Sequence, residues 1–121
     1  MKDKSYKELF DLSDKTAIVT GGAGILGSHF CAALAESGAS VAVIDINEKA
    51  AKKLAKDLKS KYGSKTLGIG CDVSNPKSVC SMVEQVVSEF GEINILHNNA
   101  AGKSDDLDAF FAPFEEYSLE Q

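Results

Sequence analysis

The most constraining feature of the sequence is a glycine-rich turn that directly follows an apolar run. The run is Ala17-Ile18-Val19, and the turn is Thr20-Gly21-Gly22-Ala23-Gly24-Ile25-Leu26-Gly27. A strand that feeds such a turn and opens a helix points several backbone N–H groups at one spot, which suits an anion such as a pyrophosphate. Glycine is needed there because a Cβ would block the tight turn or the approach of the phosphates.

An acidic residue stands where a dinucleotide site needs one. A second apolar run ends at Asp45, eighteen residues after Gly27. A carboxylate about 20 residues beyond the turn can accept hydrogen bonds from the hydroxyls of an adenosine ribose. The pattern Gly22-x-Gly24-x-x-Gly27 is weak alone, and a structural turn in another α/β domain is the alternative. Strand, turn, helix and acid together predict dinucleotide binding.

Composition excludes several classes of function. The 121 residues suffice for one domain or part of one, with a net charge of −5 and 13 cationic side chains, all of them Lys. A nucleic-acid binder normally presents a basic face with Arg, so that class is disfavoured. No apolar stretch approaches the ~20 residues of a membrane span, and no signal region follows the N-terminus. The scattered Cys31, Cys71 and Cys80 fit neither disulfide nor metal-ligand spacing, which favours a cytoplasmic protein without a metal site.

Hydrophobic periodicity predicts strands and helices in strict alternation. We expect strands over 15–20, 40–45, 66–71 and 93–98, and helices over 24–37, 47–63 and 75–90. Asn47 and Asn75 suit helix N-caps. The order βαβαβαβ predicts a doubly wound parallel sheet of the Rossmann type, with helices on both faces in three layers.

The apolar side chains also give expectations for the core. Each predicted helix carries an apolar face, and a phenylalanine-rich cluster over 110–114 is expected to patch the core rather than cover a pocket. Cys71 and Cys80 are expected to be packing residues, and His97 a half-buried histidine bonded to backbone. The other residues expected to face the core or anchor the ends are Leu9, Phe10, Leu12, Leu26, Phe30, Ala33, Leu34, Val79, Met82, Val83, Val86, Val87 and Phe90.

From Leu12 to Gly102 the sequence resembles the N-terminal half of a short-chain dehydrogenase/reductase. The resemblance rests on the glycine turn, on Asp45, on Cys71-Asp72-Val73 and on Asn98-Asn99-Ala100. Because the Asp45 carboxylate would repel the 2′-phosphate of NADP and the chain has no Arg to clamp that phosphate, the cofactor we expect within this resemblance is NAD. The roles that the resemblance implies are pyrophosphate binding by Gly21, Gly24, Ile25, Leu26 and Gly27, ribose binding by Asp45, adenine contacts by Asp72 and Val73, nicotinamide-side ribose contacts by Asn99 and Ala100, and a tie between strands by Asn98.

Two departures from the family pattern bear on the type of enzyme. The glycine spacing is that of the extended branch, which includes sugar-nucleotide epimerases and dehydratases, because Ile25 stands where the commoner branch has glycine. Asn98-Asn99-Ala100 and the approach to the fourth strand resemble the commoner dehydrogenases, which we favour. Ala101 replaces the glycine of the family signature, a small change that leaves cofactor binding expected.

The resemblance also implies what this chain lacks. The family's catalytic serine, tyrosine and lysine fall beyond Gln121, and Tyr117 has no lysine four residues on. We therefore expect a lead-in over 1–14 and a truncated NAD(P)-binding domain over 15–121, with strand order 3-2-1-4, an open edge at the fourth strand and no catalytic residue. The longer form is expected to be a homo-oligomer acting on a small molecule, with a faint likeness to sugar-acid reductases. A non-catalytic dinucleotide-binding module is the other reading.

Overall fold

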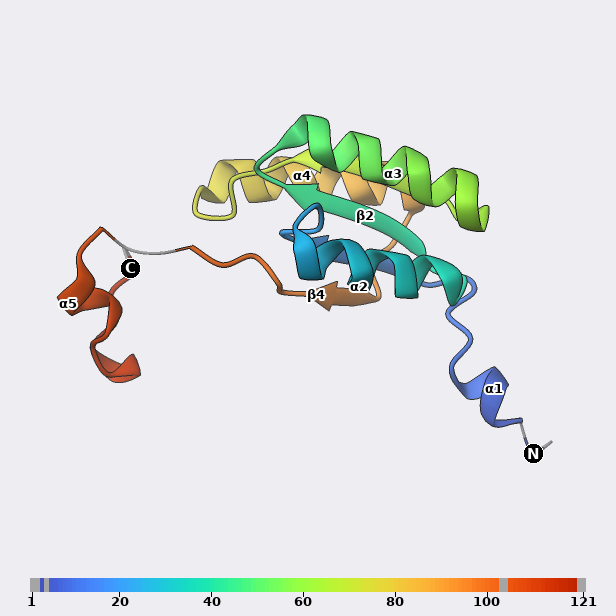
Figure 1. Ribbon diagram of the computed structural model, residues 1–121, viewed down its shortest axis with the longest axis horizontal. Helices are drawn as coiled ribbons and strands as arrows, with labels where there is room; N and C mark the ends of the chain where they lie inside the picture. The colour runs from blue at the N-terminus through green and yellow to red at the C-terminus, as the bar shows by residue number, and fades with distance from the viewer. Residues whose placement is uncertain (1–2, 4, 103–104, 120–121) are drawn as a thin grey trace.

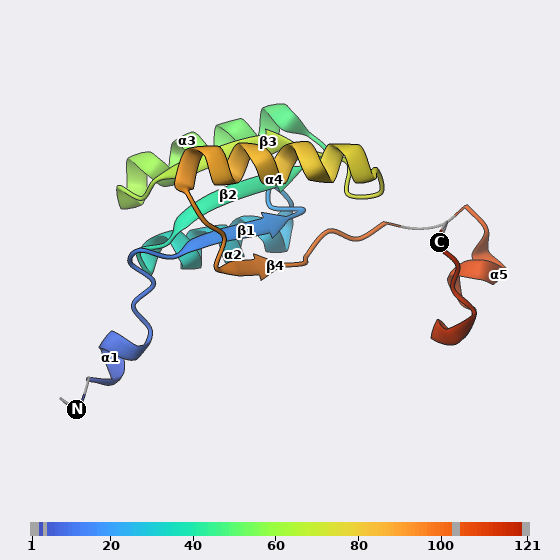
Figure 2. The same cartoon turned by 180° about the vertical axis from the view of Figure 1, so that it is seen from behind.

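The computed structural model describes residues 3, 5–102 and 105–119, and its body is a parallel sheet between two layers of helices (Figures 1 and 2). The strand order is β3-β2-β1-β4, so the predicted doubly wound topology is confirmed. The elements are α1 (Tyr6–Leu9), β1 (Thr16–Thr20), α2 (Ile25–Glu36), β2 (Ser40–Asp45), α3 (Glu48–Tyr62), β3 (Thr66–Gly70), α4 (Pro76–Phe90), β4 (Ile95–His97), α5 (Leu107–Phe110) and the 3-10 helix η1 (Phe114–Glu116).

Local sequence signals define the two long helices at their ends. The Asn47 side chain accepts a hydrogen bond from the Ala50 amide at 3.0 Å and opens α3. Asn75 caps α4 in the same way, with Pro76 at the first helical position. Gly63 ends α3 in the left-handed conformation, with φ 71°, which glycine adopts without a Cβ penalty. Each of these ends was predicted from the sequence.

The fourth strand is shorter than expected because a side chain replaces part of its backbone pairing. The predicted span was 93–98, whereas β4 covers Ile95–His97. Just before it, the Asn94 amide donates to the Thr16 carbonyl at 2.9 Å, and Asn94 Oδ1 accepts from the Thr16 amide at 2.8 Å. The side chain thereby extends the contact with β1 beyond the regular ladder.

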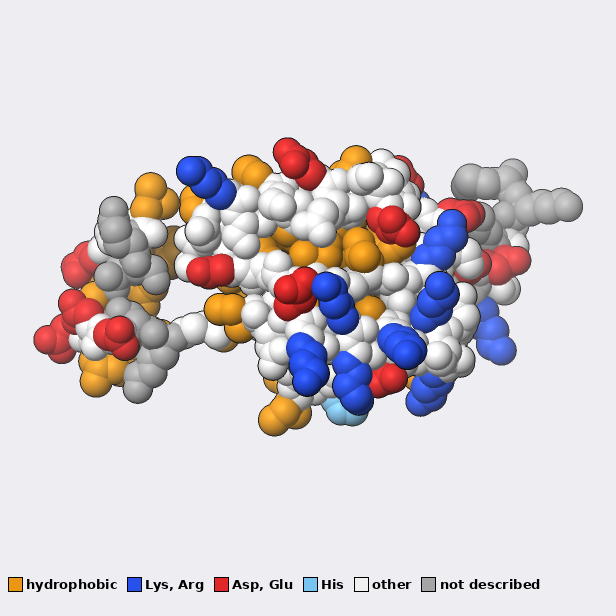
Figure 3. Space-filling model, turned by 90° about the horizontal axis from the view of Figure 1, so that it is seen from above, with side chains coloured by type: hydrophobic (Ala, Val, Ile, Leu, Met, Phe, Trp, Pro, Cys, Tyr) orange, Lys and Arg blue, Asp and Glu red, His pale blue; other side chains and the backbone are white. Residues whose placement is uncertain are grey.

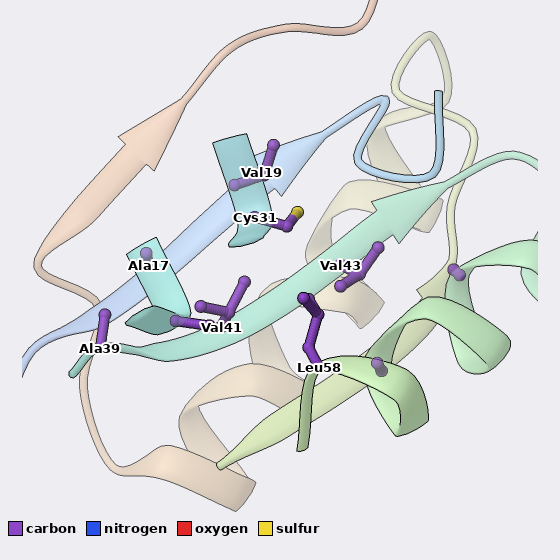
Figure 4. Packing of buried hydrophobic residues seen from close by; sticks show 10 residues of the cluster. Ala17, Val19, Cys31, Ala39, Val41, Val43 and Leu58 are labelled. Atoms are coloured by element: carbon purple, nitrogen blue, oxygen red, sulfur yellow. The ribbon is translucent and has the colours of Figure 1, made fainter. Parts of the chain in front are cut away.

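The core has two halves, one on each face of the sheet. Alternate residues of β1 and β2 point to opposite faces, as in any strand. The half under α2 and α3 includes Val19, Val43 and Leu58 (Figure 4). The half under α4 is built around Ile44 of β2 and Val86 of α4. All five residues of β1 are buried, as expected of a central strand covered on both faces.

The face that α2 turns to the sheet differs from the predicted one. Its buried residues are Gly27, Cys31 and Ala35, which are small and spaced four apart. Phe30 and Leu34 of the expected face are partly buried against the core, but Ala33 is exposed and Leu26 is 64% exposed. The small residues let the helix lie close to the strands, which the larger apolar side chains would prevent.

Two of the six residues in the apolar stripe on α4 also lie outside the core. Met82 and Val86 are buried, whereas Val83 and Val87 are exposed. Cys80 is exposed too, so its predicted packing role is wrong, while Cys71 is buried as expected. The stripe is therefore wider than the face that touches the sheet.

The ends of the chain do not pack as predicted. Leu12 lies against the core and its amide donates to the Ser37 carbonyl at 2.9 Å, but Leu9 and Phe10 are exposed. The segment 105–119, with α5 and η1, stands clear of the sheet in both ribbon views (Figures 1 and 2). Its Phe111 and Phe114 are 77% and 83% exposed, so the expected patch on the core is wrong.

The outer surface of α3 is strongly basic. Its sequence contains six lysines, and lysine side chains gather over this helix in the space-filling view (Figure 3). Ala51, Ala55 and Leu58 form its buried side. No helix in the described part of the chain is long and apolar enough to cross a membrane.

The two neighbouring valines of α4 test the burial pattern directly. Val86 is 0% exposed and Val87 is 43% exposed. Val86→Ala should lower the free energy of unfolding by about 1–3 kcal/mol, since it removes buried methyl groups and leaves a cavity. Val87→Ala makes the same change in helix propensity and should shift the free energy of unfolding by less than about 0.5 kcal/mol. Urea unfolding of the full chain measures both, and equal losses would contradict the assigned burial.

Candidate functional site

A cleft of about 590 Å³ lies at the carboxyl ends of the strands. All ten residues predicted for the site line it: Gly21, Gly24, Ile25, Leu26, Gly27, Asp45, Asp72, Val73, Asn99 and Ala100. The sequence reasoning did not assign the other lining residues: Ile44, Ile46, Cys71, Ser74, Ala101 and Gly102. Each of them lies within two positions of a predicted site residue, and this adjacency is the sequence signal that could have identified them.

The glycine turn after β1 is packed too tightly for side chains. Gly21 has φ +61°, and a Cβ on it would lie 3.0 Å from the Ala100 Cα. A Cβ on Gly27 would lie only 2.1 Å from the Gly21 carbonyl oxygen. The absence of a side chain at Gly21 therefore lets the turn lie against the loop after β4, and its absence at Gly27 lets α2 pack onto the turn.

The N-terminus of α2 differs from the other helix starts in the described residues. Side chains of Ser5, Asn47, Asn75 and Asp106 cap α1, α3, α4 and α5. At α2 the N-cap is Gly24, which provides no side-chain hydrogen bond, and its first turn has no acidic residue. Amides at this end therefore face the cleft without a capping side chain, which is the arrangement that favours an anion.

The Thr20 hydroxyl and the Asn99 side chain join the turn to the end of β4. Thr20 Oγ1 accepts hydrogen bonds from the Asn99 and Ala100 amides, both at 3.1 Å. Asn99 Nδ2 donates to the Gly21 carbonyl at 3.1 Å. We expected Asn98 to provide the tie between strands; Asn98 is exposed, and the side chain that reaches across is that of Asn99.

Asp45 connects β2 to the same turn. Its Oδ2 accepts from the Ala23 amide at 3.1 Å, and its Oδ1 accepts from the Asn47 amide at 3.0 Å. The carboxylate is thus oriented by two backbone donors while it lines the cleft. Each carboxylate oxygen can accept a second hydrogen bond, so the group retains acceptor capacity.

Asp72 follows β3 at the far side of the cleft and is held by a serine. Its Oδ1 accepts from the Ser74 hydroxyl at 2.6 Å and from the Ser74 amide at 3.0 Å. These bonds, the hydroxyl first, keep the pKa of the Asp72 carboxyl below its usual value. The Asp72 amide donates to Ser78 Oγ at 3.0 Å, which fixes the backbone of this loop to α4.

Cys31 and His97 do not line the cleft. Cys31 lies beneath the turn, and its Sγ donates to the Gly22 carbonyl at 3.7 Å. Burial raises the pKa of the Cys31 thiol to about 12, so it stays a neutral donor. His97 is half-buried as expected, but its ring is stacked on Phe30 with centroids 4.4 Å apart, rather than bonded to backbone.

The two sides of the cleft differ in their chemistry. Its acidic lining residues, Asp45 and Asp72, follow β2 and β3. On the β4 side the described lining residues are Asn99, Ala100, Ala101 and Gly102, none of which titrates as an acid or base near neutral pH. The arrangement provides hydrogen bonds and close approach for a ligand.

Comparison with known proteins decides the family. The family model of the short chain dehydrogenases matches residues 15–121. This chain belongs to the short-chain dehydrogenase family. The predicted resemblance is thus confirmed over the whole sheet and beyond it.

Two curated members of the short-chain dehydrogenase family are about two fifths identical to the chain over the aligned residues. The D-threitol dehydrogenase of Mycolicibacterium smegmatis is 39% identical over 111 residues, which is 92% of this chain and 40% of that protein. The 3-oxoacyl-acyl-carrier-protein reductase FabG of Chlamydia muridarum is 41% identical over 96 residues, 79% of this chain and 39% of that protein. The chain therefore spans about two fifths of these curated relatives.

Solved structures of family members have the same fold. A 7α-hydroxysteroid dehydrogenase complexed with NADH and 7-oxo glycochenodeoxycholic acid superposes with a TM-score of 0.76 at 30% identity, covering 83% of this chain and 38% of that one. An NAD+-bound xylitol dehydrogenase superposes with a TM-score of 0.72 at 32% identity, covering 88% and 39%.

The Thr20 hydroxyl can be tested as the junction of the site. Thr20→Val keeps the shape but removes the acceptor for two amides, and should destabilise the chain by about 1–3 kcal/mol. Thr20→Ser keeps the hydroxyl and should lose less than half as much. Urea unfolding midpoints of the two variants measure the difference. Equal stability of the valine and serine variants would show that these hydrogen bonds contribute nothing.

Proposed function

We propose that this chain is the dinucleotide-binding half of an NAD-dependent oxidoreductase that acts on a hydroxyl or carbonyl group of a small molecule. The observation that carries the proposal is the uncapped, glycine-lined N-terminus of α2, which opens into a cleft bordered by Asp45 and Asp72. NADH and NAD+ are bound by the two related dehydrogenases named above. When bound, the cofactor would supply or accept the hydride.

The residues present fit a dinucleotide. Without side chains, Gly21 and Gly27 let the turn pack against Ala100 and against α2, and the tight turn so formed lines the cleft beside the N-terminus of α2. The cleft crosses the strands in the order β1, β2, β3, which are neighbours in the sheet. Phosphates at the turn, a ribose at Asp45 and a base at Asp72 therefore follow the chemical order of a nucleotide, with the nicotinamide half toward Asn99 and Ala100.

The charge at the end of β2 supports NAD over NADP. The oriented carboxylate of Asp45 is an acceptor that suits the two hydroxyls of a ribose. The 2′-phosphate of NADP would bring negative charge against it, and like charges about 4 Å apart near a protein surface repel by about 1–4 kcal/mol. No Arg is available in the chain for a bidentate phosphate clamp, although Lys49 follows four residues later.

Titration with both cofactors tests this preference. The full chain should bind NADH about fivefold or more tightly than NADPH, as a repulsion of that size requires. Asp45→Ser should lower the ratio of NADH affinity to NADPH affinity, because it removes the repulsion. Asp57→Ala, on the exposed surface of α3, makes the same change in net charge away from the cleft and should leave the ratio unchanged. Equal or tighter binding of NADPH by the unmodified chain would overturn the preference.

We place the catalytic groups outside this chain. Reduction of a carbonyl needs an acid beside the developing alkoxide, and the described lining residues on the β4 side offer none. In domain terms, 1–14 is a lead-in and 15–121 is the cofactor-binding part of a longer catalytic domain. The threitol and xylitol dehydrogenases among its relatives support a polyol or sugar as substrate class, and a simple dehydrogenase over an epimerase.

An activity assay separates the enzyme from its alternatives. Residues 1–121 alone should show no NADH oxidation with a panel of ketoses and other carbonyl compounds, because loss of a general acid removes about 10²–10⁴ in rate and loss of the substrate wall removes positioning as well. A form extended through the family's tyrosine and lysine should turn over. Turnover by the short chain would contradict this placement, and an inactive extended form that binds NADH would favour the non-catalytic module.

A further inference from the structure

Five of the six lysines of α3 lie on one face of the helix. At about 100° per residue their side chains fall within an arc of about 120°, opposite the side that Ala51, Ala55 and Leu58 bury against the sheet. The space-filling view shows lysine side chains gathered over this helix (Figure 3), along a stretch of about 15 Å. The members of this lysine face, all of them exposed, are Lys49, Lys52, Lys53, Lys56 and Lys59.

The lysine face has more positive charge than its own helix neutralises. Two of its lysines pair with acids of α3, Lys52 with Glu48 at 2.7 Å and Lys53 with Asp57 at 3.4 Å. Lysines three or four positions apart repel one another and destabilise a helix, so an anionic partner surface would offset this repulsion. The lysines of the face that form no ion pair with a described residue are Lys49, Lys56 and Lys59.

The segment 105–119 has the opposite charge and exposed aromatic rings. It contains no Lys, Arg or His, and the rings of Phe111 and Phe114 are exposed. Its shape depends on contacts of its own, because the Tyr117 hydroxyl donates to the Phe110 carbonyl and the Phe110 ring packs edge-on against Phe111. The acidic residues of the segment are Asp105, Asp106, Asp108, Glu115 and Glu116.

Carboxylates and aromatic faces attract the same kind of group. An ammonium pairs with a carboxylate and also binds over an aromatic ring, within about 6 Å of its centre. α3 contains an example of the second contact, since Lys61 Nζ lies 5.2 Å from the centroid of the Tyr62 ring. The apolar stems of lysines also cover apolar surface. The lysine face therefore matches both the charge and the rings of the segment 105–119.

We propose that the lysine face of α3 binds the segment 105–119 of a second copy of this chain. A second copy fits better than the same copy, because α3 packs on β2 and β3 whereas the segment follows β4 at the other edge of the sheet. Both ribbon views show the segment well away from α3 (Figures 1 and 2). Each copy has both surfaces, so two copies related by a two-fold axis make the contact twice. The proposal is independent of dinucleotide binding.

Sedimentation velocity of the full chain tests the association. Dimers should form at about 100 µM protein, a weak contact on the usual scale of affinities, when the ionic strength is about 0.01 M and charges act over about 30 Å. They should dissociate in about 1 M NaCl, where that range falls to about 3 Å.

Two charge reversals identify the surfaces. One variant combines Lys56→Glu with Lys59→Glu on α3, and the other combines Asp108→Lys with Glu115→Lys on the segment; all four positions are exposed. Each variant alone should dimerise at least about tenfold more weakly, because attraction becomes repulsion at both contacts. An equimolar mixture of the two should recover a dimer, since each reversed surface then meets its complement.

A matched control and a cross-link complete the test. Lys65→Glu combined with Lys77→Glu makes the same change in net charge at exposed positions outside α3 and should leave dimerisation unchanged. Carbodiimide joins a lysine directly to a carboxylate that it touches. In a mixture of isotope-labelled and unlabelled chains it should link α3 of one copy to the segment 105–119 of the other.

The contrary outcomes are distinct. A chain that stays monomeric at low ionic strength, or a dimer that neither reversal weakens, overturns the proposal. So does a mixture of the two reversed variants that fails to recover the dimer, because a complementary pair of surfaces requires recovery. Cross-links found only within one copy would place the segment on its own α3 and overturn it as well.

Discussion

The geometry of the site depends on the Thr20 hydroxyl, which accepts two amides from the end of β4. β1 and β4 are adjacent in the sheet but far apart in the sequence, and the ladder between them covers only three residue pairs. The hydroxyl continues this contact past the last pair, and Asn99 reinforces it through the Gly21 carbonyl. The turn is therefore held from β4 on one side and from Asp45 of β2 on the other, so its amides are oriented before any ligand arrives.

The lining of the cleft combines the glycine turn with the carboxylates of Asp45 and Asp72. The described cleft contains two carboxylates: both oxygens of Asp45 accept backbone amides, and Oδ1 of Asp72 accepts the amide and the hydroxyl of Ser74. A carboxylate that is already oriented loses little conformational freedom on binding, which makes it an efficient hydrogen-bond acceptor for a hydroxyl or an amine. The glycines contribute by the absence of side chains, which lets the turn pack closely against Ala100 and α2.

Features set by local chemistry could be predicted from the sequence, and features set by distant contacts could not. Asn47 and Asn75 cap their helices through neighbours three residues away or fewer, so their roles are legible in the sequence. Val87 and Phe114 have the apolar character of core residues but lie outside the core, because burial depends on what packs against them. The tie by Asn99 rather than Asn98 depends on the path of the backbone after β4, which no local pattern specifies. The stacking of His97 on Phe30 is equally non-local.

The buried thiol of Cys31, beneath the turn, allows opening of the site to be followed by chemical modification. Cys31 is fully buried and bonded to the Gly22 carbonyl, so a thiol reagent reaches it only when the turn separates from α2. Its modification rate therefore measures how often this junction opens, with the exposed Cys80 as an internal reference for reagent quality. A ligand that closes over the turn must slow the modification of Cys31 and leave that of Cys80 unchanged, so the ratio of the two rates reports occupancy of the cleft.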